Sequence, residues 1–586
     1  MVPPFPSSMT TTLTSVLLLI VATFGGYSLA DTSAFLRCPL QCRCDGNYTS
    51  AVSTCDHSYL TDIPKLPVAT WKIVITGNNI TRIRGGAFSE LHKVTIMYIT
   101  NNNIRAIDER GFAGLSSLRH LVLKEKRMSS LRNGTFRFFT QLSVLSMTAK
   151  FIEIPQTELC MLKHLTSLKL VRLRFSASVF HPCFEELNEL KQLTLQYLQQ
   201  SNISDLTFHP FRSSLKTLDI MHCGLRRLDV DMFKDLSQLN NLDLSYNDIT
   251  DLPINIFAPL TRLTQLILAG NNLKVFSSEL LRPLRHLKVL NIGYNSRLNL
   301  TLGKEFVNMT WLNTITLSGI KLTSLNNATF QNLRFCPLIQ IVISQCSLRS
   351  ISKDAFQPLR NLTMLNLDSN PLNNSVLHSA FYGLQEAPLD RLDLEHVHLS
   401  RYSTTLFEGL NDSHITRLSL EQSLIPSIKR GVFRNVRDVV RLDMSSNKIA
   451  SIEDHSFVDL RNLSYLTLYE NNIAEMYSAK RLGISPALEY LRLTRNAITE
   501  IQAASLLGYD NLRILYMKRN KIRKITSNAF ASTPRLKQLV LSINSITRIQ
   551  PGTFDTLPDL VFLDLSRNSI TLDDTSLFQV CLNLHF

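Results

Sequence analysis

The stretch Leu239-Asn-Asn-Leu-Asp-Leu-Ser-Tyr-Asn247-Asp-Ile249 decides how this chain folds. It follows the pattern L-x-x-L-x-L-x-x-N-x-L, which recurs cleanly from Leu263, Leu463 and Leu560. If Ile, Val, Met and Thr are accepted at the apolar places, repeats begin at 70, 94, 118, 142, 165, 190, 215, 239, 263, 287, 312, 338, 362, 389, 415, 439, 463, 488, 512, 536 and 560. These 21 repeats have a mean period of 24.5 residues, so the chain is one repeat array.

The spacing inside each repeat predicts a short strand with one buried face. Apolar positions 4 and 6 alternate with variable positions 3, 5 and 7, which is the period of a pleated strand. Stacked repeats then form a parallel sheet along an arc of roughly 100 Å, with strands ~4.8 Å apart. We therefore expect an α/β-type leucine-rich-repeat solenoid (horseshoe), with a concave parallel β-sheet and an irregular or short-helical convex side.

Two further positions predict how the repeats stack. Position 9 is Asn in twelve repeats, and Cys223 and Cys346 take its place in two others. A buried side chain there must satisfy neighbouring backbone groups, so both cysteines are interpreted as structural. Position 19 is Phe in fourteen repeats, for example Phe88 and Phe554, and these rings should form a buried spine on the convex side.

Seven repeats have neither Asn nor Cys at position 9. They carry Lys126, Lys150, Leu173, Leu198, Ile320, Val397 and Ser423. Breaks in the asparagine ladder should loosen the stacking, so a change of curvature or twist is expected near 118–200 and 389–425.

Composition excludes several classes of protein. The 586 residues are 44% hydrophobic with a mean hydropathy of +0.03, which is incompatible with wholesale disorder. Only 20 Gly and 21 Pro occur, so a collagen-like chain is excluded. The net charge of +15 favours anionic partners or surfaces.

The two ends of the chain predict entry into the secretory pathway and an uncapped C-terminal repeat. Residues 1–30 contain an apolar run, Val16–Phe24, and the small-x-small pattern Ser28-Leu29-Ala30, typical of a secretory signal peptide. An uncut signal anchor is the alternative, because the first residues have no Lys or Arg. We expect a cap over 31–69, repeats over 70–583 and the start of a truncated repeat at 584–586. The uncapped C-terminal end of a solenoid is hydrophobic, so the chain as given should aggregate or need a partner there.

The ten cysteines agree with an oxidising compartment. The cluster Cys38-Pro-Leu-Gln-Cys42-Arg-Cys44, followed by Cys55, resembles the N-terminal cysteine cap of extracellular leucine-rich-repeat proteins, with a zinc knuckle as the alternative. That resemblance implies the pairs Cys38–Cys44 and Cys42–Cys55. Position counting independently predicts a third bond between Cys160 and Cys183, which occupy the spine position of consecutive repeats. Cys336 and Cys581 have no partner that can be derived.

Sequons predict glycosylation that spares the concave face. They occur at Asn47, Asn79, Asn133, Asn202, Asn299, Asn308, Asn327, Asn361, Asn373, Asn411 and Asn462. None lies at variable strand positions 2, 3, 5, 7 or 8, and none follows Asn462.

No motif for catalysis, a cofactor or a metal is found. The chain has no H-E-x-x-H, G-x-S-x-G, Walker loop or G-x-G-x-x-G. His396 and His398 lie at the end of a predicted strand without a third ligand, so a solvated edge is favoured over a metal site. We therefore expect neither enzymatic activity nor a cofactor.

The cap, the long uninterrupted array and its irregular middle repeats resemble the ectodomain of a Toll-like receptor over residues 31–586. The resemblance implies binding of pathogen-derived lipids, proteins or nucleic acids in innate immunity, with dimerisation of two ectodomains on ligand binding. The chain departs from that family because it has no C-terminal cysteine cap, membrane span or cytoplasmic Toll/interleukin-receptor domain, so a fragment or a soluble decoy is expected. A secreted or cell-surface adhesion or matrix protein is the alternative.

The repeats near the C-terminus predict where a ligand binds. Residues 471–549 contain 13 Lys and Arg against 4 Asp and Glu. Such charges repel one another unless an anion is bound, so an anionic ligand is expected: nucleic acid, an acidic glycan or a lipid head group. A solvated basic face is the alternative. The candidate ligand-binding residues are Tyr490, Arg492, Arg495, Arg513, Tyr516, Lys518, Arg519 and Lys537.

Overall fold

The computed structural model describes residues 38–571 except 48, 129–130, 150–155, 174–179, 199–207 and 412. The predicted signal peptide at 1–30, Lys150, Asn202, Cys581 and the segment 584–586 lie outside the described residues. The chain divides into two compact units, Met1–Leu165 and Thr166–Phe586. This division falls inside 118–200, where four successive repeats lack the position-9 asparagine.

The first unit is built from a cap and the first strands of the array. Strand β1 (Arg43–Gly46) forms an antiparallel hairpin with β2 (Ala51–Asp56), and β2 pairs in parallel with β3 (Thr70–Thr76). Strands β5 (Ile96–Thr100), β7 (His120–Glu125) and β8 (Val144–Ala149) then add in chain order, all parallel. The short strands β4 (Arg82–Ile83) and β6 (Ala106–Ile107) pair separately, and α2 (Gln156–Cys160) follows β8.

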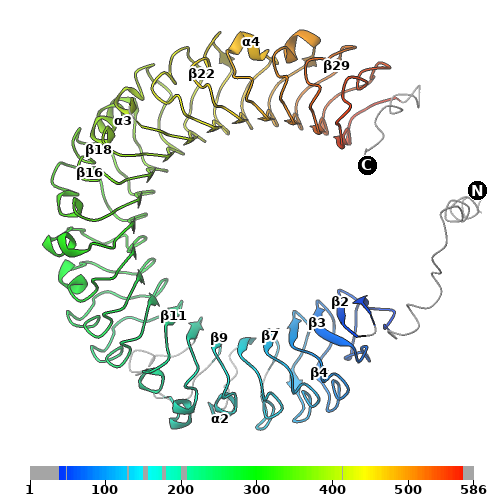
Figure 1. Ribbon diagram of the computed structural model, residues 1–586, viewed down its shortest axis with the longest axis vertical. Helices are drawn as coiled ribbons and strands as arrows, with labels where there is room; N and C mark the ends of the chain where they lie inside the picture. Colours follow the sequence, from blue (N-terminus) through cyan, green and yellow to red (C-terminus); the bar gives the residue numbers. More distant parts are fainter. Residues whose placement is uncertain are drawn as a thin grey trace, which may run out of the picture. The chain divides into compact units, whose positions relative to one another are not determined.

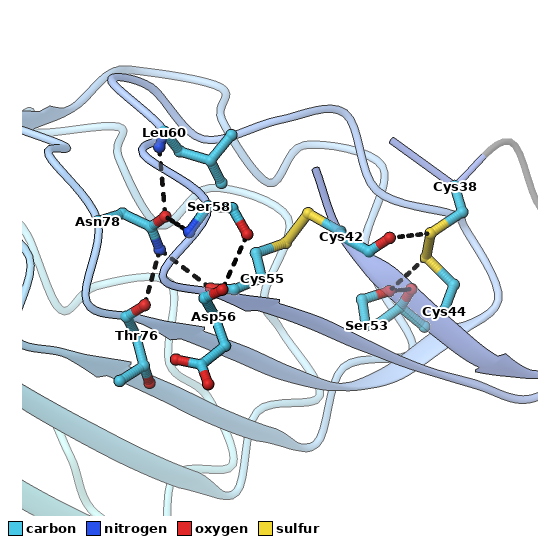
Figure 2. Close-up of a disulfide and its surroundings, with 11 residues drawn as sticks. Cys38, Cys42, Cys44, Ser53, Cys55, Asp56, Ser58, Leu60, Thr76 and Asn78 are labelled. Carbon is cyan, nitrogen blue, oxygen red and sulfur yellow. Dashed lines mark hydrogen bonds between the residues drawn. A yellow bond between two sulfur atoms is a disulfide. The ribbon is translucent and has the colours of Figure 1, made fainter. Parts of the chain in front are cut away.

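Two disulfides hold the cap together. Cys38 is bonded to Cys44 and Cys42 to Cys55, so the hairpin is linked covalently to the segment before it (Figure 2). The pairing implied by the family resemblance is confirmed. Because the β2 edge of the sheet is covered by β1, the first repeat does not expose an unpaired strand.

The second unit continues with one strand after each predicted repeat start from 165 to 560. The strands are β9 (Ser167–Val171), β10 (Gln192–Gln196), β11 (Thr217–Met221), β12 (Asn241–Asp243), β13 (Gln265–Ile267), β14 (Val289–Asn291), β15 (Thr314–Thr316), β17 (Gln340–Val342), β19 (Met364–Asn366), β20 (Arg391–Asp393), β21 (Arg417–Ser419), β23 (Arg441–Asp443), β25 (Tyr465–Thr467), β26 (Tyr490–Arg492), β28 (Ile514–Tyr516), β30 (Gln538–Val540) and β31 (Phe562–Asp564). Each pairs in parallel with the next, and within this unit they line the inner side of an arc (Figure 1).

Among the described residues, the outer side of the second unit carries short elements, as expected. The helices are α3 (Asn374–Phe381) and α4 (Ala479–Leu482), with 3-10 turns η1 (Pro182–Glu186), η3 (His209–Phe211), η4 (Ser278–Leu281), η5 (Lys304–Asn308), η6 (Gln331–Leu333), η7 (Tyr382–Leu384), η8 (Glu408–Leu410) and η9 (Ala503–Leu506). Two-residue strand pairs join β16 (Ser324–Leu325) to β18 (Ser350–Ile351), β22 (Ser427–Ile428) to β24 (Ser451–Ile452), and β27 (Glu500–Ile501) to β29 (Lys524–Ile525). Among the described residues, no helix is long and apolar enough to cross a membrane.

The apolar positions of the repeat set the register of the sheet. Leu242 pairs with Leu218 on one side and with Leu266 on the other, and all three side chains are fully buried. A slip of one residue would move every leucine to the solvent face, so the repeat pattern admits one register.

The position-9 asparagines form hydrogen bonds between neighbouring repeats. Asn247 donates from Nδ2 to the carbonyls of Ile220 and Leu244, at 2.7 and 2.9 Å. Its Oδ1 accepts from the backbone N–H of Cys223 and Leu225, at 2.8 and 3.3 Å. One side chain thus satisfies buried groups in two neighbouring turns, which explains why Asn recurs.

Two predicted breaks in this ladder are repaired by other side chains. The expectation of loosened stacking at Ser423 is wrong, because Ser423 Oγ donates to the carbonyls of Leu394 and Glu421, at 2.8 and 3.1 Å. Near Lys126 the neighbouring Glu125 is fully buried, and its carboxylate accepts the Asn102 backbone N–H at 3.0 Å. The change of curvature or twist expected near 118–200 and 389–425 stays a prediction, since other breaks there, Leu173, Leu198 and Val397, carry apolar side chains.

The cysteines at position 9 also replace asparagine. Cys223 Sγ donates to the carbonyls of Leu195 and Met221, at 3.5 and 3.3 Å, and Cys346 makes the equivalent pair. Burial raises the pKa of both thiols to about 11. Cys336 is buried as well, and its Sγ lies 3.3 Å from the Phe306 carbonyl. All three are free thiols held in the neutral form, as expected of structural cysteines.

The position-19 phenylalanines are buried in a spine beneath the convex segments. Phe330 stacks on Phe356 with ring centroids 5.9 Å apart, and Phe433 stacks on Phe457 at 5.8 Å. All four rings are at most 1% exposed. The interpretation of this stripe as core, rather than as a binding surface, is confirmed.

The predicted Cys160–Cys183 bond joins residues that belong to different units. Cys160 ends α2 in the first unit, and Cys183 lies in η1 of the second. The bond stays a prediction from the repeat positions.

Candidate ligand-binding surface

The predicted candidate residues lie on three neighbouring strands of the second unit. The register pairs Tyr490 of β26 with Tyr465 of β25 and pairs Arg492 with Tyr516 of β28. Lys537 directly precedes β30, which is the next strand. Parallel pairing therefore brings these side chains onto one part of the concave face, which we call the tyrosine–arginine patch: Tyr465, Tyr469, Tyr490, Arg492, Arg495, Arg513, Tyr516, Lys518, Arg519 and Lys537.

Aromatic rings form the floor of the tyrosine–arginine patch. Tyr465 and Tyr490 stack with centroids 4.0 Å apart, and Tyr516 meets Tyr490 edge to face at 5.6 Å. The Arg492 guanidinium lies 4.3 Å from the centroid of Tyr469. Burial and the neighbouring Tyr465 raise the pKa of Tyr490, so this hydroxyl is neutral at physiological pH. The rings are half-buried, and the Tyr516 hydroxyl donates a hydrogen bond to Gln538 Oε1 at 2.9 Å.

The charges of the patch are partly neutralised by the chain itself. Arg495 Nη1 lies 2.9 Å from Glu470 Oε1 and 3.0 Å from the Tyr469 hydroxyl, and Glu470 raises the pKa of Arg495. Arg513 pairs with Glu489 at 3.5 Å. The expectation that these charges repel one another until an anion binds is therefore wrong for Arg495 and Arg513.

The remaining cations define where an anion would bind. Within the described part of the chain, no carboxylate oxygen lies within 4 Å of the ammonium or guanidinium nitrogens of Lys518, Arg519 or Lys537. These three residues belong to two adjacent repeats: Lys537 directly precedes β30, whereas Lys518 and Arg519 follow β28, so positive charge lies at both ends of these strands.

An acidic strip on the concave face borders the tyrosine–arginine patch. Asp368, Glu395 and Glu421 occupy position 7 in three successive repeats, with Asp393 and Asp443 at position 5 beside them. Arg391 pairs with Asp393 at 2.9 Å and offsets part of this charge. The strip would repel a polyanion, so it disfavours binding of an anionic ligand across β19, β20, β21 and β23.

We expect the acidic strip to make stability depend on pH. Burial, with the charges of Glu395 and Asp393, raises the pKa of Asp368 to about 6. The folded chain thus binds this proton more tightly than the unfolded chain, and the contribution of Asp368 to stability increases as pH falls from 7 through 6. Asp368→Asn should stabilise the fold at pH 7 by on the order of 1 kcal/mol, with a difference that shrinks towards pH 5. Urea unfolding at several pH values measures this.

Asp354→Asn is the matched control, since Asp354 is exposed on the convex side. Equal pH profiles for Asp368→Asn and the unsubstituted chain would contradict a raised pKa at Asp368.

The other sequence candidates lie away from this surface. His396 and His398 are exposed beyond the end of β20, as expected of a solvated edge. The described sequon asparagines are all exposed, and Asn373 also caps α3 by accepting the N–H of Val376. Exposure makes these positions accessible to glycosylation, which stays a prediction.

Sequence reasoning missed four residues of this surface: Tyr465, Tyr469, Glu470 and Glu489. Tyr465 could have been found, because it occupies position 3 like Tyr490 in the next repeat. The carboxylate partners are harder to find, since Glu470 and Arg495 are 25 residues apart and only the stacking brings them together.

Comparison with known proteins places these features in a family. The family model described as "Leucine rich repeat" matches residues 72–128, 213–273, 310–372, 413–473, 486–544, 510–570 and 534–584. Leucine-rich repeat-containing protein 3B of Homo sapiens is 33% identical over 101 residues, which cover 17% of this chain and 39% of that protein. Opticin of Mus musculus is 26% identical over 227 residues, which cover 39% of this chain and 59% of opticin. The chain therefore spans only part of the length of these relatives.

A solved structure covers more of the chain. The crystal structure of a TLR13–ssRNA13 complex matches with a TM-score of 0.71 and 22% sequence identity, over 93% of this chain and 85% of that one. At this identity the match establishes a shared fold.

Proposed function

The chain belongs to the leucine-rich-repeat family, and from this we propose that it is the ligand-binding ectodomain of a Toll-like pattern-recognition receptor in innate immunity. It binds its ligand on the concave face, at the tyrosine–arginine patch, and pairs with another leucine-rich-repeat ectodomain. The role is binding rather than catalysis, and the chain is secretory and extracellular, or anchored to a membrane if it is part of a longer receptor.

The observation that carries this proposal is the set of unpaired cations beside stacked tyrosines. Lys518, Arg519 and Lys537 offer three positive charges with no described carboxylate oxygen within 4 Å, in the repeat that contains Tyr516 and the repeat after it. Cations beside exposed rings suit a ligand that has anionic groups and planar or apolar parts. The fold shared with the TLR13–ssRNA13 complex agrees with such a ligand.

Similarity to opticin favours one other function, that of an adhesion or matrix protein. The distinction lies in the ligand: a receptor requires a discrete site, whereas a basic matrix protein can bind polyanions over its whole surface. The following experiment separates the two.

Reversing the charges of Lys518, Arg519 and Lys537 to Glu should lower the affinity for a polyanion by at least tenfold. Each lost contact should also reduce the dependence of affinity on salt, because fewer counterions are released on binding. Heparin and a single-stranded oligonucleotide are suitable probes, with affinity measured at several salt concentrations.

Lys304, Arg434 and Lys480 provide a control with the same change of charge. They are exposed on convex segments, and no described carboxylate lies within 4 Å of their charged nitrogens. If both triple variants lose the same affinity, binding depends on general charge and the proposed site is wrong.

A further inference from the structure

Another group of cations lines a pocket at the edge of the second unit where the strands begin, in other repeats than the tyrosine–arginine patch. The pocket has a volume of about 420 Å³, a size usual for sites that bind small ligands. Cations, neutral hydrogen-bonding groups and one indole meet in it, and we call it the indole pocket. Its lining includes Lys216, Asn240, Arg262, Thr264, Lys288 and Trp311.

The stacking of the repeats places four of these residues in a row. Lys216, Asn240, Thr264 and Lys288 directly precede β11, β12, β13 and β14, in four successive repeats. Backbone hydrogen bonds of 2.7 to 2.8 Å join each residue of the row to the next. Lys216 and Lys288 are therefore three strands apart, ~14 Å at ~4.8 Å per strand, with an amide and a hydroxyl side chain between them.

No nearby carboxylate offsets the positive charge of the indole pocket. Among the described residues, no carboxylate oxygen lies within 4 Å of the charged nitrogens of Lys216, Arg262 or Lys288. Arg262 has a neutral partner instead, because its Nη1 donates to Gln238 Oε1 at 2.5 Å. This hydrogen bond orients the guanidinium without neutralising its charge, so the pocket is prepared for an anionic group.

The indole of the pocket is exposed beside one of the cations. Trp311 is 53% exposed, although tryptophan is highly buried on average. The Lys288 ammonium lies 5.6 Å from the centroid of the Trp311 ring. An anionic group bound to Lys288 would therefore bring the rest of its molecule to the indole. The face of an indole carries partial negative charge, which attracts the C–H groups on the apolar face of a sugar ring.

The order of the side chains indicates the class of ligand. Cations separated by Asn240 and Thr264 suit a molecule whose carboxylates alternate with hydroxyl groups. A densely charged polyanion would leave the amide and the hydroxyl unused, and a fatty acyl chain would need an apolar lining. An unsulfated acidic glycan has one carboxylate on every second sugar ring, with hydroxyl groups and C–H faces between, and matches all three kinds of side chain.

We propose that the indole pocket binds an unsulfated acidic glycan, an oligosaccharide in which uronic acids alternate with N-acetylated sugars. Its carboxylates bind the cations Lys216, Arg262 and Lys288, its hydroxyl groups form hydrogen bonds with Asn240, and one sugar ring packs against Trp311. This inference goes beyond the proposed function, because the indole pocket lies in other repeats than the tyrosine–arginine patch and takes a ligand of low charge density.

The test detects binding through Trp311 itself. The chain has two tryptophans, and Trp71 belongs to the first unit, so Trp71→Phe leaves Trp311 as the single tryptophan of the full chain. The probe is a hyaluronan hexasaccharide, which should cause a saturable change in Trp311 fluorescence. In this background, Arg262→Gln and Lys288→Gln should each lower the affinity roughly tenfold, because each removes a hydrogen bond between opposite charges.

Lys448→Gln is the matched control for these two variants. Lys448 is exposed in a different part of the array, and no described carboxylate oxygen lies within 4 Å of its Nζ. The affinity of Lys448→Gln should equal that of the unsubstituted chain. Calorimetry with both tryptophans intact gives a second measurement, in which Trp311→Ala should lower the affinity roughly fivefold, the size of one aromatic contact.

Two further probes separate an acidic glycan from other molecules. A glutamate peptide has carboxylates without sugar rings, and a chitin hexasaccharide has sugar rings without carboxylates, so neither should change the fluorescence of Trp311. An equal response to the glutamate peptide would overturn the proposal in favour of an acidic peptide. Unchanged fluorescence at saturating hyaluronan hexasaccharide, or equal losses of affinity for Lys288→Gln and Lys448→Gln, would also overturn it.

The charge reversal of Lys518, Arg519 and Lys537 distinguishes this proposal from the proposed function. The reversal should leave the response of Trp311 to the hyaluronan hexasaccharide unchanged, since the indole pocket keeps all its cations. A response that survives the reversal supports the indole pocket even if the tyrosine–arginine patch fails. A response lost on the reversal would mean that the hexasaccharide binds through general charge, and the indole pocket would not be its site.

Discussion

Replacing Asn471 by alanine is expected to lower the free energy of unfolding by about 3–5 kcal/mol, because a buried polar group left unpaired costs about 1–3 kcal/mol. Asn471 Nδ2 donates to the carbonyls of Met444 and Leu468, at 3.0 and 3.1 Å, and its Oδ1 accepts the N–H of Ile449 at 3.0 Å. Alanine can form none of these hydrogen bonds, and Asn471 is buried, so water does not readily reach the groups that would be left unpaired. Urea unfolding followed by circular dichroism measures the loss.

Asn472 is the matched control because it is the same residue type, one position later, and exposed. Asn472→Ala should change stability by less than about 0.5 kcal/mol, as surface substitutions usually do. Since each repeat contacts only its neighbours, Asn471→Ala should also broaden the unfolding transition. Similar stabilities for the two variants would contradict the bridging role of the ladder asparagines.

The repeat pattern alone predicted the parts of the fold that each repeat specifies for itself. Leu242 is buried and in register with Leu218 because both occupy position 4, and Asn247 bridges two turns because its amide both donates and accepts. These properties follow from one residue at one position. They could therefore be read from the sequence without knowing the neighbouring turns.

Features that depend on two neighbouring repeats were missed. Ser423 looked like a break in the ladder because only its residue type was considered, yet its hydroxyl reaches the Leu394 carbonyl of the preceding turn. Glu125 was overlooked because it lies one position before the expected place. The ion pair of Arg495 with Glu470 also joins two turns. Aligning residues by repeat position, rather than reading along the chain, would have revealed such pairs.

The same reasoning explains why the candidate site was only partly predicted. Counting charges between 471 and 549 selected β26, β28 and β30 as the candidate strands, and whether a ligand binds there stays a prediction. A count of charges does not show which are neutralised, and Arg513 is paired with Glu489 while Lys518 is not paired with any described carboxylate.

The second large effect is expected in the phenylalanine spine. Phe356 is 1% exposed and stacks on Phe330 with centroids 5.9 Å apart. Phe356→Ala should destabilise the fold by about 3–5 kcal/mol, since it removes apolar contacts and leaves a cavity between two turns. Phe356→Leu retains much of the volume and should cost less than about 1.5 kcal/mol. Both values come from urea unfolding of the full chain.

Phe335→Ala is the matched control, because it removes an exposed phenylalanine instead of one from the buried spine. Its ring is 62% exposed and lies beside the Arg334 guanidinium, 5.2 Å from the ring centroid. Phe335→Ala should therefore cost less than about 1 kcal/mol, because little apolar area returns to water. If Phe335→Ala and Phe356→Ala were equally destabilising, the convex spine would not be the core of this array. The order expected is Phe356→Ala, then Phe356→Leu, then Phe335→Ala, because burial rather than residue type sets the loss.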